Sequence, residues 1–198
     1  MTVRAAMMAA GLVLAGMAAG MGAGTEAVAQ EATDNGAGLN IGEQVVDGRT
    51  VGEEYLKETF GDWAHRCVVA AEGDDPCNSY QLLFDEDGNS VAEISIVPLS
   101  DAGQAVAGGT IVTPLETLLT RQITLQIDAG PGRRYPFTFC ARTGCISRVG
   151  FTAEDLDALK RGAEATLTIV PAGAPDNPVA LSVSLTGFTA AFDALEPR

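Results

Sequence analysis

The chain has 198 residues, and its 26 acidic against 12 basic side chains leave a formal net charge of −14. A surface this acidic repels nucleic acid and anionic lipid, which argues against either as a partner. The length is sufficient for one domain with a core of its own.

The N-terminus has the pattern of a secretory signal peptide. Arg4 precedes an apolar run from Ala5 to about Met21, and Ala27-Val28-Ala29 fits the small-x-small rule for cleavage before Gln30. We therefore expect residues 1–29 to be a signal peptide, and no later segment is long and apolar enough to span a bilayer. The mature protein is expected in the periplasm, with outer-membrane association or secretion as further options.

Residues 30–59 are acidic, rich in glycine and poor in large apolar side chains. This composition predicts a flexible N-terminal segment, with one weak helical turn at Glu53–Glu58. The folded domain is then expected to span residues 60–195.

From Phe60 onward, period-two alternation predicts about eight short strands separated by turns. In the first of them, Trp63 and Cys67 share a face, and the only tryptophan is expected in the core. Further strands are expected in the ranges 80–84, 91–99, 122–128, 165–170 and 179–185. This pattern is typical of an all-β sandwich.

The stretch from Tyr135 to Val149 is predicted to form a β-hairpin. Tyr135, Phe137 and Phe139 alternate along one strand, so they share a face, which we assign to the core. Gly144 can take the positive φ that the turn often needs.

Two short helices are expected beside the strands. Thr152 is a helix N-cap followed by acidic residues, and Lys160-Arg161-Gly162 ends that helix. A second, C-terminal helix would place Phe188 on its core side.

Four cysteines in an exported chain predict two disulfides, for which three pairings are possible. Strand parity favours the two local bridges, Cys67 with Cys77 and Cys140 with Cys145. A zinc site is the weaker alternative, because the spacings differ from the usual C-x2-C pairs. We expect no metal and no cofactor.

A catalytic set is not apparent in the sequence. His65 is the only histidine, and a partly buried, hydrogen-bonded side chain is favoured over a catalytic base. The pattern Asp85-x-Asp87-x-Asn89 resembles half of a calcium loop, but Ser90 stands where glycine is required, so a turn is expected. The candidate binding residues are His65, Arg133, Arg134 and Arg142.

Several motifs together resemble the invasion-associated locus B (IalB) family. They are FGDWAHRC, a second cysteine four residues before Gln81, ID…YPFTFC…GC, LKRG and VSLTGFTAAF. The resemblance implies an exported bacterial protein with an immunoglobulin-like β-sandwich, and it supplies no catalytic residues.

Three functions compete at this point. The first is a non-enzymatic protein that binds a protein or an envelope component. The second is an envelope glycan or peptide hydrolase using carboxylates, which requires acids converging in a cleft. The third is a small-ligand carrier, which requires an apolar cavity between the sheets.

Overall fold

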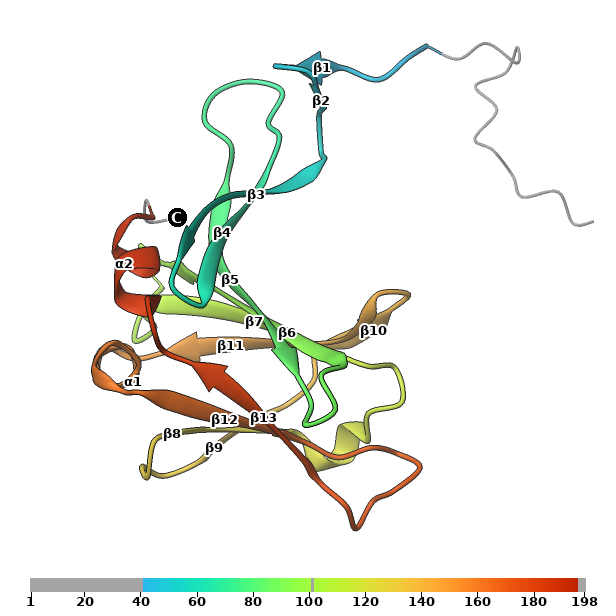
Figure 1. Ribbon diagram of the computed structural model, residues 1–198, viewed down its shortest axis with the longest axis vertical. Coiled ribbons are helices and arrows are strands. Elements are labelled where there is room, and N and C mark those ends of the chain that lie inside the picture. Colours follow the sequence, from blue (N-terminus) through green and yellow to red (C-terminus); the bar gives the residue numbers. More distant parts are fainter. Residues whose placement is uncertain (1–40, 101, 196–198) are drawn as a thin grey trace, which may run out of the picture. The chain divides into compact units, whose positions relative to one another are not determined.

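The computed structural model describes residues 41–100 and 102–195, which form an all-β, sandwich-like fold with two helices (Figure 1). The expected signal peptide and the beginning of the N-terminal segment lie outside the described residues. A seven-stranded sheet has the order β10-β11-β7-β6-β5-β4-β3, and a four-stranded sheet has the order β13-β12-β8-β9. All strand pairs among the described residues are antiparallel.

The strands of the larger sheet are β3 (Glu54–Phe60), β4 (Trp63–Val68), β5 (Cys77–Phe84), β6 (Ser90–Pro98), β7 (Ala107–Thr113), β10 (Phe139–Ala141) and β11 (Gly144–Phe151). Those of the smaller sheet are β8 (Ile123–Ile127), β9 (Arg133–Tyr135), β12 (Glu164–Ile169) and β13 (Val179–Ser184). The remaining elements are the hairpin β1 (Val45–Val46) and β2 (Arg49–Thr50), a 3-10 turn at Leu119–Arg121, and the helices α1 (Ala153–Arg161) and α2 (Phe188–Asp193).

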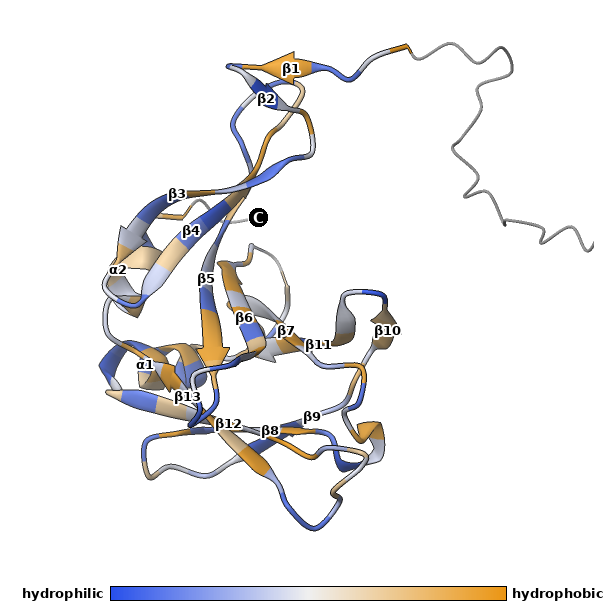
Figure 2. Cartoon of the chain, turned by 45° about the vertical axis from the view of Figure 1, so that its right-hand side comes forward, coloured by the Kyte–Doolittle hydropathy of each residue, from blue (hydrophilic) through white to orange (hydrophobic). Residues whose placement is uncertain are grey.

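One hydrophobic core joins the facing sides of the two sheets. The alternation expected along the strands is present: Trp63, Ile94 and Leu167 are each at most 1 % exposed and belong to the same cluster. Phe188 is also completely buried. Figure 2 shows the change in hydropathy along β5, whose final residues are apolar.

The interpretation of residues 53–58 as a helical turn was wrong. Glu54–Phe60 is strand β3, the edge strand paired with β4, and the compact unit of the structure begins at Gly42. The boundary expected at residue 60 therefore leaves one strand of the large sheet outside the domain. An edge strand exposed on both faces needs no period-two alternation, and the register of β3 also shifts at a bulge between Leu56 and Glu58.

The hairpin around the second cysteine pair is shorter than predicted. Tyr135 ends β9 in the small sheet, whereas Phe139 begins β10 in the large one. Pro136 has no amide hydrogen to donate to a ladder, and the chain passes from one sheet to the other just after Tyr135. As a result, Tyr135 and Phe137 are partly buried against the core, but Phe139 is 45 % exposed, so its assignment to the core was wrong.

The two disulfides join the pairs that strand parity favoured. Cys67 is bonded to Cys77 across β4 and β5, and Cys140 to Cys145 across β10 and β11. Gly144 follows the two-residue turn with φ +142°, and a Cβ there would lie 2.4 Å from the carbonyl oxygen of Thr113 on β7. Glycine is therefore required by the neighbouring strand as well as by the turn.

Helix α1 begins as its sequence predicts. The Thr152 hydroxyl accepts a hydrogen bond from the Asp155 amide, and the Asp155 carboxylate accepts one from the Thr152 amide, which completes a capping box. An ion pair between Lys160 and Asp193 joins α1 to α2, and the two helices lie at the same end of the sandwich (Figure 1).

A set of contacts that we call the clasp joins the β3–β4 turn and β5 to the end of β13. The Trp63 indole N–H donates to the Ser184 carbonyl oxygen at 2.7 Å. The buried Gln81 amide donates to the same oxygen at 3.0 Å and accepts from the Ser184 amide at 2.9 Å. The Asp62 amide donates to the Thr186 carbonyl oxygen at 3.1 Å. The clasp thus ties the two sheets together through the backbone groups of Ser184, at the end of β13, and of Thr186, just after it.

Two glycines allow the two backbone segments of the clasp to lie close to each other. Gly187 has φ +87°, and a Cβ at this position would lie 1.8 Å from the carbonyl oxygen of Phe60. Gly61 has φ +60°, and its Cβ would lie 2.8 Å from the carbonyl oxygen of Thr186. Any side chain would push the two segments apart.

We expect Gly187→Ala to lower the free energy of unfolding by about 3 kcal/mol or more, because a left-handed φ is combined with a backbone clash. The matched control is Gly173→Ala, since a Cβ at Gly173 meets nothing within 4 Å. Denaturant unfolding of both variants measures the difference. Equal stabilities of the two variants would contradict the close approach at Gly187.

Candidate functional site

A large hollow on the described part of the chain lies beside the Cys67–Cys77 bridge. Its volume is about 770 Å³, and we call it the acidic cleft. The walls come from the β1–β2 hairpin, from Lys57 on β3, from the loop between β4 and β5, and from the residues that follow α2. Its charged lining residues are Asp47, Arg49, Lys57, Glu72, Asp74 and Asp75.

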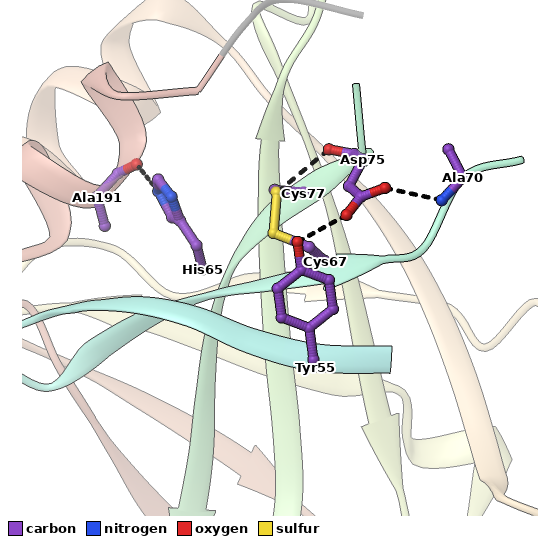
Figure 3. Close-up of a disulfide and its surroundings, with 7 residues drawn as sticks. All are labelled: Tyr55, His65, Cys67, Ala70, Asp75, Cys77 and Ala191. Atoms are coloured by element: carbon purple, nitrogen blue, oxygen red, sulfur yellow. Dashed lines mark hydrogen bonds between the residues drawn. A yellow bond between two sulfur atoms is a disulfide. The ribbon is translucent and has the colours of Figure 1, made fainter. Parts of the chain in front are cut away.

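The β4–β5 loop, which forms one wall, is fixed at several points. Cys67 and Cys77 close its base. One carboxylate oxygen of Asp75 accepts from the Ala70 amide at 2.8 Å, and the other accepts from the Tyr55 hydroxyl at 2.7 Å (Figure 3). The Arg49 guanidinium lies 3.9 Å from the centre of the Tyr55 ring. The wall is therefore held in place by a covalent bridge and by a carboxylate that joins the loop to β3.

These contacts shift the pKa values of two ionisable groups in opposite directions. The hydrogen bond from the Ala70 amide, followed by that from the Tyr55 hydroxyl, lowers the pKa of Asp75 below its ordinary 3.8. The hydrogen bond to Asp75 raises the pKa of Tyr55 above its ordinary 10.0. At neutral pH the pair is thus a carboxylate and a protonated hydroxyl.

His65 lies in the wall of the cleft but is used by the fold. It is 5 % exposed, and its Nε2 is 2.7 Å from the Ala191 carbonyl oxygen, which can only accept, so Nε2 carries the proton and donates. Its ring centre is 4.6 Å from that of Phe60. Figure 3 shows the ring directed at α2. The expectation of a buried, hydrogen-bonded histidine is confirmed.

The three candidate arginines do not line the cleft, and the structure does not bring them to one surface with His65. Arg133 on β9 pairs with Asp155 of α1 at 2.8 Å. Arg134 is exposed on the same strand, and Arg142 is exposed on the turn between β10 and β11 in the other sheet. These residues therefore stay separate candidates.

The cleft places several carboxylates together, but its groups do not form a recognisable catalytic pair. A general acid at neutral pH needs a raised pKa, whereas the pKa of Asp75 is lowered. Cys77 is in a disulfide, and His65 donates to the backbone. Among the described residues that line the cleft, there is no serine or threonine. The arrangement is suited to holding a cation or a basic side chain.

The hydrogen bond between Asp75 and Tyr55 was not predicted from the sequence. The signal that could have found it was a β-strand at 54–60, which would have placed Tyr55 beside the base of the loop. The register pairs Tyr55 directly with Cys67.

The Asp85–Asn89 segment is the turn that was expected. One carboxylate oxygen of Asp85 accepts from the amides of Asp87 and Asn89 at 3.0 and 2.8 Å. Within the described residues, no group of three or more histidine, cysteine or acidic side chains is arranged to hold a metal ion. In the same residues, no helix has the length and apolarity needed to cross a membrane.

Replacement of Asp75 by asparagine is expected to lower the thermal unfolding midpoint at neutral pH, because the amide cannot accept from both Ala70 and Tyr55 as the carboxylate does. The folded-state pKa is depressed, so this stabilisation is complete above pH 3.8 and is lost as the pH falls through the lower folded-state value. Melting curves of wild type and Asp75→Asn between about pH 2.5 and about pH 7 test this. A difference between the two unfolding midpoints that stays constant down to acid pH would contradict this role of the Asp75 carboxylate.

Comparison with known proteins identifies the family of the chain. A sequence model of the family described as Invasion associated locus B (IalB) protein matches residues 63–196. Invasion protein B homologs of Brucella abortus strain 2308 and of its biovar 1 strain 9-941 are each 28 % identical over 145 residues, covering 73 % of this chain and 82 % of theirs. The crystal structure of invasion associated protein B from Bartonella henselae superposes with a TM-score of 0.57 at 29 % identity, covering 69 % of this chain and 92 % of that one. The chain therefore belongs to the IalB family.

Proposed function

We propose that this protein is exported and serves as a non-catalytic binding protein of the bacterial envelope, whose acidic cleft takes a positively charged segment of a partner polypeptide. The names of its relatives describe invasion proteins and not enzymes, which agrees with a binding role. The signal-peptide pattern and the two disulfides support an oxidising compartment such as the periplasm.

The observation that carries the proposal is the cleft itself. Its volume of about 770 Å³ is in the range of ligand-binding sites. Four carboxylates and two cationic side chains line it, on a chain with a net charge of −14. Complementary charge speeds the encounter with a basic partner and disfavours an acidic one.

The fixed wall also favours binding. Because the Cys67–Cys77 bridge and the Asp75 contacts hold the β4–β5 loop before a partner arrives, less conformational entropy is lost on association. Glu72 and Asp74 are exposed on this loop and have no hydrogen bond or ion pair with any other described residue. They are therefore free to meet a partner's cation.

A hydrolase that uses carboxylates is the second candidate, since acids do converge in this cleft. A hydrolase of this kind would need one acid that stays protonated near neutral pH. The pKa of Asp75 is instead lowered below its ordinary value. Binding is the function that the geometry supports better.

Removal of two cleft charges is expected to weaken partner recovery. The double variant Glu72→Gln with Asp74→Asn leaves the Asp75 contacts in place, and we expect it to recover about tenfold less of the partner that is cross-linked from envelope extract at about 0.15 M salt. The matched control is Glu86→Gln with Asp87→Asn. It removes the same charge from exposed residues of the turn at the other end of β5.

We expect the cleft variant to recover less partner, while the control variant recovers as much as the wild type. Recovery by the wild type should also decline as the salt concentration rises. Equal recovery by the two double variants would overturn the cleft as the contact surface.

A further inference from the structure

A second, smaller hollow lies at one end of the sandwich, apart from the acidic cleft. Residues of β8, β9, β11 and α1 line it, and its volume is about 120 Å³. Its inner wall is apolar and includes Leu125, Phe151 and Ala158. Phe151 is 1 % exposed and Leu125 4 %, so the hollow reaches the core where the two sheets meet.

The volume sets the size of an occupant. An apolar cavity of about 150 Å³ in another protein holds one benzene molecule. A hollow of about 120 Å³ with an open side can therefore receive a single six-membered ring. The Tyr135 and Phe151 rings are 6.4 Å apart and meet edge to face, and such aromatic walls favour a flat apolar occupant.

The rim of the hollow is polar and held in a fixed geometry. Arg133 pairs with Asp155 at 2.8 Å, and Asp155 is also held by the amide and the hydroxyl of Thr152, at 3.0 and 2.8 Å. Arg133 is thus neutralised, while Glu154 adds a negative charge at the rim. This balance disfavours an anionic occupant.

Tyr135 supplies the polar group that has no partner. It lines the hollow, is partly buried, and its hydroxyl makes no hydrogen bond with any described residue. Burial, and then the charge of Asp155, raise the pKa of Tyr135 above its ordinary 10.0. The hydroxyl therefore keeps its proton at neutral pH and can donate.

We propose that this hollow binds a small, uncharged ring compound with one hydrogen-bond acceptor, which packs against Phe151 and accepts from the Tyr135 hydroxyl. The site shares no lining residue with the acidic cleft and does not depend on the function proposed for it.

Phenol and benzene are the two probes, because they share a ring and differ in the polar atom. Titration of the protein with phenol, followed by two-dimensional NMR, should shift the amide signals of Tyr135, Phe151 and Ala158, with a dissociation constant of about 1 mM or lower. Benzene should shift the same signals and bind more weakly. If neither probe shifts them, the proposal is overturned.

Two variants locate the site. Ala158→Leu fills the hollow and should abolish both sets of shifts, whereas Ala190→Leu, an exposed helical alanine outside the lining, should leave them unchanged. Unchanged phenol binding by Ala158→Leu would overturn the site.

Tyr135→Phe keeps the ring and tests the hydroxyl even if Ala158→Leu does not fold. It should weaken phenol binding about fivefold, the effect of one hydrogen bond, and leave benzene binding unchanged. Equal phenol affinities for wild type and Tyr135→Phe would overturn the assigned hydrogen bond.

Discussion

The close approach of the β3–β4 turn to the end of β13 is the constraint on which the rest of the structure depends. Trp63 and Gln81 both donate to the carbonyl oxygen of Ser184, which therefore accepts two hydrogen bonds from the other sheet. Gly61 and Gly187 leave no room for a Cβ between the two backbones. Buried polar groups that satisfy one another in this way specify a single arrangement, because any shift would leave them unpaired.

The clasp also places one wall of the acidic cleft. Phe188 packs on Trp63, with ring centres 5.0 Å apart, and the His65 side chain donates to Ala191, so α2 is held against β4. The chain then continues into Ala194 and Leu195, which line the cleft. Residues that hold the fold together thus fix where a surface site can form.

The structural roles of the motif residues explain why the family resemblance does not specify a reaction. The motifs that carry it include Trp63, His65, Gln81 and Gly187, and the structure uses each of them in packing or in the clasp. The acids of the cleft come instead from the β1–β2 hairpin and from the β4–β5 loop. A fold can be shared while the sites on its loops differ, so function has to be argued from the site.

The sequence by itself determined the elements whose signal is local. Alternating side chains located β4, β6 and β8, the N-cap Thr152 with its acidic first turn located α1, and strand parity indicated the cysteine pairing. The tertiary structure alone decided that β3 is an edge strand, that the run from Tyr135 to Phe139 divides between two sheets, and that Trp63 meets a carbonyl 121 residues away. The reason is physical: a periodic pattern records which face of a strand is buried, and it carries no information about the partner that buries it. For the same reason neither the acidic cleft nor the small hollow could be predicted, since each is assembled from segments that are distant in sequence.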